Sequence, residues 1–424
     1  MAAQLASTMG RAMQLGDLRQ RILYTVAMFT VFLIGAHIPV PGINAAALTN
    51  LFAQGTFFGL LNLFSGGALK VFAVFAMSVT PYINASIIMQ LLTLVVPQVE
   101  EWQKEGPEGQ KRINQWTRYG TVLLGVVQAF ALSIYLQDNH GLLHPGFRSI
   151  ITVVVVLTAG TTFLMWIGEQ MTEHGIGNGI SLLIFAGIVS RLPRATGTLY
   201  TYLTSGRINW FNVIILIILA VLIVAAVVAV TQAARRIPVQ YAKRVVGRRL
   251  YSAQGSYIPI RVNQAGVIPV IFAASVLTVP LTLTQFVASG WLTNLANFFR
   301  STSVWYELVY AALIIAFTFF YTSIVWNPHD VADNIRKYGG FIPGYRPGHP
   351  TAEYLARVLE RVTVLGAIFL AAVSVLPVVF SGLTNIPNLY FGGTALLIVV
   401  GVALDTMMQI EGHMLMRHYQ GFIR

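Results

Sequence analysis

The chain contains no cysteine among its 424 residues. Disulfide bonds, thiolate metal sites and cysteine nucleophiles are therefore excluded. Charge is also scarce, because only 10% of the residues are charged, against about 25% in ordinary globular proteins. Acidic residues are the rarer kind, with 15 Asp and Glu against 27 Lys and Arg. Since 56% of the residues are apolar, this composition excludes a soluble enzyme and indicates a polytopic membrane protein.

Ten charge-poor apolar stretches are candidate membrane-spanning helices, so we predict an all-α fold. They lie at residues 22–38, 72–96, 119–136, 150–168, 180–192, 211–231, 265–284, 305–326, 362–380 and 393–411. Ten spans place both termini on one side. If that side is the cytoplasm, it holds 21 of the 27 Lys and Arg, as the positive-inside rule requires. No soluble domain remains once the spans are removed.

Three of these spans make poor membrane helices. Residues 72–96 carry Pro81 among polar side chains, residues 180–192 reach Arg191 after eleven residues, and residues 265–284 contain Pro269 and Pro280. Such spans survive where protein or water satisfies the freed backbone groups, so we expect them to line an interior. The alternative is that these residues are buried in ordinary bundle packing. The predicted halves, 1–192 and 193–424, have inverted topology, which suits a pathway between them.

A further apolar stretch, at residues 57–69, is too short to cross the membrane. It either folds back into the membrane as a short re-entrant helix or lies at the membrane surface as an amphipathic segment. The sequence does not decide between these two structures.

Catalytic and ion-coupling groups are scarce. Asp405 is the best intramembrane ionisable residue, and a local polar pairing explains it more simply than a proton relay does. The histidines have no carboxylates at metal-ligand spacing, so we expect neither a metal nor a cofactor. The glycine-rich run at residues 175–179 lacks the strand and the lysine of a phosphate-binding loop, which predicts a tight turn before the next span.

Two loops of roughly thirty residues face the predicted cytoplasmic side, at residues 232–262 and 327–357. The first carries seven Lys and Arg and no acidic residue. Its ends are rich in β-branched and aromatic residues, which predicts a hairpin or extended finger turning near Gly255. The positive-inside rule accounts for much of this basic charge, but binding of RNA or of an acidic protein surface accounts for it equally well.

Three stretches resemble the SecY family, the channel subunits of the bacterial Sec protein-translocation complex. They are SVTPYINASIIMQLLT at residues 78–93, TAGTTFLMWIGEQMTEHGIGNGISL at 158–182 and GGFIPGYRPGHPTAEYL at 339–355. The likeness extends over all ten spans. It implies two five-helix halves around an hourglass pore, with a short plug helix that closes the outer funnel.

The resemblance also implies roles for individual residues. The aliphatic pore ring falls on isoleucine at every position: Ile83, Ile87, Ile180, Ile184, Ile271 and Ile398. The plug corresponds to residues 57–69, with Phe57, Leu60, Leu61, Leu63, Phe64, Ser65, Gly66, Gly67 and Ala68. The polar residues assigned to a lateral gate are Thr80, Gln90 and Asn263. The residues assigned to contact with a motor or ribosome are Arg346, Lys243, Arg244, Arg248 and Arg249.

The implied function is a passive protein-conducting channel in the bacterial cytoplasmic membrane. Its implied partners are the small membrane subunits SecE and SecG, the SecA motor ATPase, the ribosome, signal sequences, unfolded preproteins and membrane lipid. Energy comes from the motor or the ribosome, so the chain itself is not an enzyme. The alternative is an ion-coupled secondary solute transporter, which also has ten spans and broken helices but normally carries more charge in the membrane.

Overall fold

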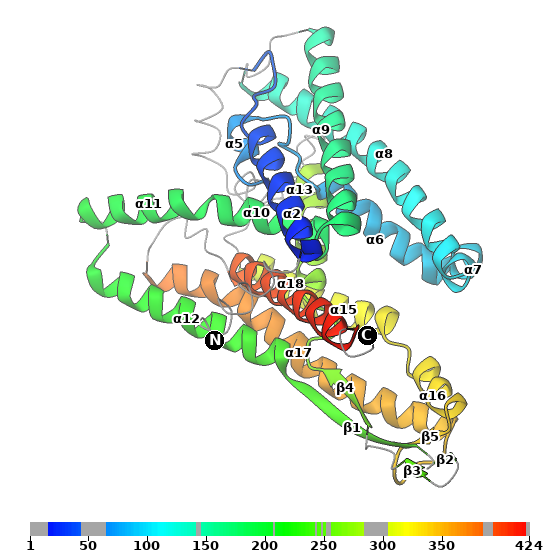
Figure 1. Ribbon diagram of the computed structural model, residues 1–424. Coiled ribbons are helices and arrows are strands. Elements are labelled where there is room, and N and C mark those ends of the chain that lie inside the picture. Colours follow the sequence, from blue (N-terminus) through cyan, green and yellow to red (C-terminus); the bar gives the residue numbers. More distant parts are fainter. Residues whose placement is uncertain are drawn as a thin grey trace. The chain divides into compact units, whose positions relative to one another are not determined.

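The computed structural model describes residues 16–43, 65–140, 146–206, 208–241, 244–246, 249–251, 256–283, 304–384 and 393–420. Its helices (Figure 1) are α2 Gly16–Gly35, α5 Ala68–Val71, α6 Thr80–Val95, α7 Pro97–Lys104, α8 Pro107–His140, α9 Phe147–His174, α10 Gly179–Ser190, α11 Leu192–Thr204, α12 Trp210–Gln232, α13 Ile268–Leu283, α15 Val304–Val325, α16 Pro328–Lys337, α17 His349–Thr384 and α18 Gly393–Gln420. Its strands are β1 Ala234–Tyr241, β2 Arg244–Val246, β3 Arg249–Tyr251, β4 Ser256–Arg261 and β5 Gly340–Phe341.

Each of the ten predicted spans contains a helix. Within the described residues, eight helices are long and apolar enough to cross a membrane. The count becomes nine if α6 and α7, which meet at an angle of 99°, form one broken span. The predicted span at 265–284 contains the shorter apolar helix Ile268–Leu277.

The predicted start of the second span, at residue 72, is too early. The helix starts at Thr80 and not at residue 72, because residues 72–79 form turns in which Phe72 and Ser78 have φ angles of 49° and 54°. The backbone of this segment is satisfied elsewhere. The Phe72 carbonyl accepts from the Val40 amide at 2.9 Å, and the Val74 amide donates to the Ile38 carbonyl at 2.9 Å. Apolar composition alone cannot separate such a turn from a helix.

The fifth span is longer than predicted. Helix α10 ends at Ser190, and α11 begins at Leu192 with Pro193 in its first turn, where proline leaves no helical hydrogen bond broken. The two helices together form one candidate span, Gly179–Thr204, of 26 residues. Arg191 therefore interrupts an apolar run without ending the span.

The chain divides into two compact units. The first comprises Met1–Asn209, Ala274–Tyr306 and Val402–Arg424, and the second comprises Trp210–Ala273 and Glu307–Gly401. In the first unit, α8 packs along both α6 and α9. One core of this unit joins α5 and the turn that follows it to α8 and α9, through Leu69, Phe72, Leu136 and Leu157.

The second unit contains a small subdomain made from both predicted long loops. Its sheet has the strand order β4-β1-β5, and β1 pairs antiparallel with both neighbours. Helix α16 and the start of α17 cover this sheet (Figure 1). The buried residues of its core are Ile237, Val239, Ile260, Ala332, Ile335, Ile342, Ala352, Leu355 and Leu359. We call this the loop subdomain. The two loops thus share a core that the sequence prediction did not foresee.

The predicted hairpin is present, but the predicted position of its turn is wrong. In the β1–β4 ladder Val239 pairs with Ser256. In the β2–β3 ladder Arg244 pairs with Tyr251, and Val246 pairs with Arg249. Four residues separate the two ladders on each strand, so both have the same register. The chain therefore reverses between Val246 and Arg249 and not at Gly255, because Tyr251 already lies on the returning strand.

Leu355 is fully buried in the loop subdomain. We expect Leu355→Ala to destabilise the subdomain by about 2–5 kcal/mol, because it removes buried methyl groups and leaves a cavity. Limited proteolysis of detergent-solubilised protein measures this, and cleavage within 232–262 and 327–357 should accelerate. Arg357→Ala, an exposed change on the same helix, is the control and should leave the cleavage rate unchanged.

Candidate functional site

Four of the six predicted ring isoleucines lie in the first unit, on α6 and α10. Ile83 and Ile87 are one helical turn apart on α6, and both are buried. Ile184 is buried on α10, and Ile180, one turn earlier, is half-buried. Residues four apart share a helix face, so each helix presents a continuous aliphatic stripe. Such a stripe offers contact area without fixed hydrogen bonds.

The other two ring isoleucines lie in the second unit. Ile271 on α13 and Ile398 on α18 are both buried. Gly401 lies so close to the Val267 side chain that no Cβ would fit there. Val267 is one helical turn before Ile271, and Gly401 is one turn after Ile398. This close contact between the two segments is therefore adjacent to both isoleucines. The assembly of all six into one ring stays a prediction.

The predicted plug lies mostly outside the described residues, including Phe57, Leu60, Leu61, Leu63 and Phe64. Its described end is a turn, followed by the four-residue helix α5.

The small residues at this end allow close packing against α10. Ser65 and Ala68 are fully buried. A Cβ added to Gly66 would lie 3.0 Å from the Gly187 Cα and 3.4 Å from the Ser190 Oγ. The guanidinium of Arg194 lies near Gly67, at 3.9 Å from the position of a Cβ there.

The three polar residues assigned to a lateral gate are divided between the units. Thr80 begins α6 and is buried. The Gln90 Nε2 donates weakly to Ser86 Oγ at 3.4 Å, while its buried Oε1 accepts no hydrogen bond from the described residues. The buried Oδ1 of Asn263, in the second unit, also accepts none within the part of the chain that the structure describes. A buried carbonyl oxygen that lacks a donor costs about 1–3 kcal/mol of stability.

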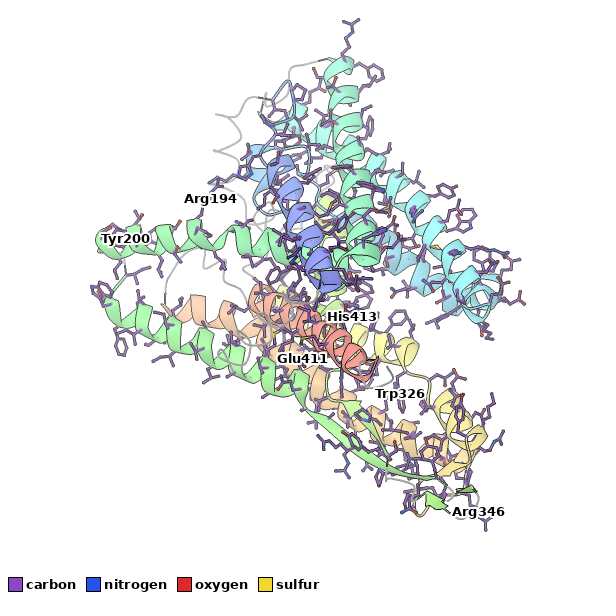
Figure 2. The ribbon with its side chains drawn as sticks, viewed as in Figure 1. Arg194, Tyr200, Trp326, Arg346, Glu411 and His413 are labelled. Atoms are coloured by element: carbon purple, nitrogen blue, oxygen red, sulfur yellow. The ribbon has the colours of Figure 1, made fainter. Side chains whose placement is uncertain are left out.

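Arg346 lies in an exposed, rigid turn at the edge of the loop subdomain (Figure 2). Gly344 and Gly348 have φ angles of 88° and 106°, which side chains other than glycine rarely adopt. The Arg346 carbonyl accepts from Thr351 Oγ1 at 2.7 Å. Tyr345 stacks on Tyr354 of α17, with ring centroids 4.2 Å apart. These backbone and neighbouring contacts hold the turn and leave the guanidinium exposed.

The basic residues of the hairpin are described only in part. Arg244 and Arg249 lie in β2 and β3, which pair antiparallel. Lys243 and Arg248 lie outside the described residues. On the long β1–β4 ladder, the Arg236 guanidinium lies 4.9 Å from the centre of the Tyr257 ring, a cation–π contact that adds an exposed cation to the same hairpin.

No metal site is found among the residues that the structure describes, in which no three His, Cys, Asp or Glu side chains could hold an ion together. The ring centroids of His329 and His349 are 5.8 Å apart, and His349 Nδ1 lies 3.2 Å from Glu353 Oε1. All three side chains are exposed.

Comparison with known proteins identifies the fold and the family. A family model described as SecY matches residues 73–407. The chain belongs to the SecY family. The protein translocase subunit SecY of Halalkalibacterium halodurans is 46% identical over 431 residues, covering 98% of this chain and 99% of the relative.

Two solved channels share the SecY fold. One structure is described as showing that the plug domain of the SecY protein stabilises the closed state of the translocation channel and maintains a membrane seal. It aligns with a TM-score of 0.66 and 19% identity, covering 92% of this chain and 91% of that one. The other is Sec61 in the canine ribosome-channel complex from the endoplasmic reticulum, with a TM-score of 0.64, 19% identity and the same coverage. The predicted fold class, a helical multi-pass channel, is confirmed.

Family membership also settles the class of function. SecY proteins are subunits of the protein translocase, so this chain is a translocation channel and not a solute transporter. The scarcity of charged residues within the spans agrees with a channel that carries no coupling ion.

Several structurally important residues escaped the sequence prediction. The apolar residues of α16 recur at Val331, Ala332 and Ile335, and this helical spacing was the available signal for the loop subdomain. By contrast, Arg21, Thr25 and Gln409 bind the 175–179 turn from more than 150 positions away. A local sequence pattern cannot predict hydrogen bonds between residues so far apart in the chain.

Proposed function

We propose that this SecY chain conducts unfolded secretory proteins across the bacterial cytoplasmic membrane and releases transmembrane segments sideways into lipid. The observation that carries the proposal is the match to a protein translocase subunit over 98% of the chain. In this proposal both termini are cytoplasmic, which the basic loops support through the positive-inside rule.

The constriction in this proposal consists of the six isoleucines. A narrow aliphatic ring excludes water and thereby blocks ions. It also provides no hydrogen-bond donor or acceptor, so a sliding polypeptide of any sequence meets little specific attraction. Five of the six are buried, and the six lie on α6, α10, α13 and α18, which supports the proposal.

The plug in this proposal closes the outer funnel at rest. The fit of Gly66 against Gly187 supports a closely seated resting position. The small side chains of Ser65 and Ala68 and the two glycines between them also suit easy departure when a chain enters. The related channel whose plug domain maintains a membrane seal supports the same role here.

Gly66→Ala should raise the resting ion conductance. The left-handed conformation of Gly66 costs a residue with a Cβ about 1–2 kcal/mol, and the new methyl group would also press on Gly187. Gly42→Ala is a matched control, because Gly42 has a φ of 90° but no described residue lies within 4 Å of a Cβ there. Planar-bilayer recordings should show an ion leak for Gly66→Ala only. Equal conductance of Gly66→Ala and Gly42→Ala would contradict the proposed close packing of Gly66 against Gly187.

Translocation needs an external source of energy, and we propose that SecA or a translating ribosome supplies it. SecE and SecG are the small membrane subunits of the proposed complex. The exposed guanidinium of Arg346 and the basic hairpin support contact with carboxylate or phosphate groups of such partners. The canine relative, which was solved in a ribosome-channel complex, supports the ribosome as a partner.

The direct test is uptake of a signal-bearing unfolded preprotein into proteoliposomes that contain this chain, SecE, SecG, SecA and ATP. Protease-protected preprotein is measured with and without the chain, and with ATP replaced by ADP. We expect protection only when both the chain and ATP are present. Equal protection in vesicles without the chain, or none with the complete set, would overturn the proposal.

A further inference from the structure

The loop at residues 175–179, which joins α9 to α10, is closely surrounded by other parts of the chain. A Cβ on Gly175 would lie 2.7 Å from Thr25 Oγ1, and one on Gly179 would collide with the Gly168 carbonyl. Gly177 has a φ of 86°, and a Cβ there would lie 3.1 Å from Thr406 Oγ1. Its glycines therefore mark a place where several helices approach one backbone.

Side chains from α2 and α9 bind this loop. Arg21 of α2 donates through Nη1 to the Gly175 carbonyl at 3.2 Å, and the Ile176 amide donates to Thr25 Oγ1 at 3.3 Å. The Gly179 amide donates to Thr172 Oγ1 of α9 at 2.9 Å. These bonds fix the loop and the first residue of α10 against α2 and α9.

Helix α18 binds the same loop from the other end of the sequence. The Gly177 amide donates to Gln409 Oε1 at 2.9 Å. One residue later on α18, Ile410 packs in a small core with Leu18 and Ile176. The apolar contact holds the helix in place, but a hydrogen bond to one amide also fixes its rotation and its position along the axis.

The two residues joined by this hydrogen bond, Gly177 and Gln409, are each connected to predicted ring isoleucines through a helix. Ile180 follows the loop at once, and its side chain is pressed against Gly168. Ile398 lies eleven residues before Gln409 on α18, about 16 Å along a helix that rises 1.5 Å per residue. The loop therefore joins the helices that carry Ile180, Ile184 and Ile398.

We propose that the 175–179 loop is a brace for the constriction and that Gln409 is a positioning residue of the channel. The bond between Gln409 and Gly177 sets the rotation and height of α18 relative to the start of α10. Through these two helices it sets the position of the isoleucines that close the pore. This inference rests on the proposed function, because it assigns a purpose to the brace within a channel.

The test compares Gln409→Met, Gln409→Glu and Glu411→Met in the complete chain with SecE and SecG. Methionine matches glutamine in length but accepts no comparable hydrogen bond, whereas glutamate keeps an acceptor oxygen. Glu411, two residues further along α18 and exposed (Figure 2), is the matched control for adding a methionine.

Two measurements test separately whether the hydrogen bond between Gln409 and Gly177 forms and whether it helps to close the pore. Amide hydrogen exchange in nanodiscs should be about fivefold faster for the peptide that contains Gly177 in Gln409→Met, as expected for one lost hydrogen bond. Resting ion conductance should rise by a similar factor. Gln409→Glu and Glu411→Met should both behave as the wild type in the two measurements.

Each outcome decides one point. Unchanged exchange in Gln409→Met would overturn the brace, and faster exchange with unchanged conductance would overturn the positioning role. A wild-type chain that fails to translocate preprotein would overturn the proposed function, while the exchange result would still report on the bond itself.

Discussion

We expect Ile83→Ser combined with Ile184→Ser to raise the resting ion conductance of the channel at least about tenfold. Each change replaces an aliphatic side chain with a smaller one that binds water. The narrowest part of the pore then stays hydrated, and the barrier to ion passage falls. A tenfold effect corresponds to a barrier lower by about 1.4 kcal/mol. Planar-bilayer recordings without any preprotein measure this.

Two controls make the result specific to the constriction. Ile83→Leu combined with Ile184→Leu keeps the apolar volume and should keep the seal. Ile314→Ser removes an equally buried isoleucine on α15, outside the predicted ring, and should lower thermal stability without a comparable leak. A double-serine channel that is as tight as the wild type would contradict the assignment of Ile83 and Ile184 to the ring.

Arg346→Glu should reduce SecA-driven preprotein uptake at least about tenfold. A hydrogen bond to a charged group contributes about 1.5–3 kcal/mol, and reversal of the charge adds repulsion to its loss. The fold should persist, because the turn is held by the Arg346 carbonyl, Thr351 and the stack of Tyr345 on Tyr354. Uptake into proteoliposomes and direct SecA binding are the two measurements.

Arg346→Lys tests the geometry of that contact. Lysine keeps the charge but loses the planar fork that binds carboxylate or phosphate bidentately, so we expect intermediate uptake. Arg357→Glu makes the same change of net charge on an exposed position of α17 and should leave uptake near the wild-type level. Equal loss in Arg346→Glu and Arg357→Glu would indicate a general charge effect and would contradict a specific contact at Arg346.

The sequence predicted the membrane spans well because their physics is local. A run of apolar residues long enough to cross hydrocarbon is visible without any knowledge of its neighbours. The tight turn at 175–179 was predicted for the same reason, and the structure confirms it with Asn178, whose side chain caps α10 through the Ser181 amide. The reversal of the hairpin was foreseen as well, although not its position.

The errors arose where tertiary contacts override composition. Residues 72–79 are as apolar as a helix, yet they pair with the segment after α2. Arg191 looked like the end of a span, yet α11 continues beyond it. The core of the loop subdomain joins strands and helices that are about 70 residues or more apart along the chain, so neither loop alone reveals it.

That separation along the chain also matters while the protein is being made. The hairpin ends at Arg261, but Leu355 and Leu359, which cover it, are synthesised almost a hundred residues later. At about 5–20 residues per second, Ile237, Val239 and Ile260 wait roughly 5 to 20 seconds for the part of their cover that α17 supplies. The apolar core of the loop subdomain is therefore completed only after most of the chain has been made.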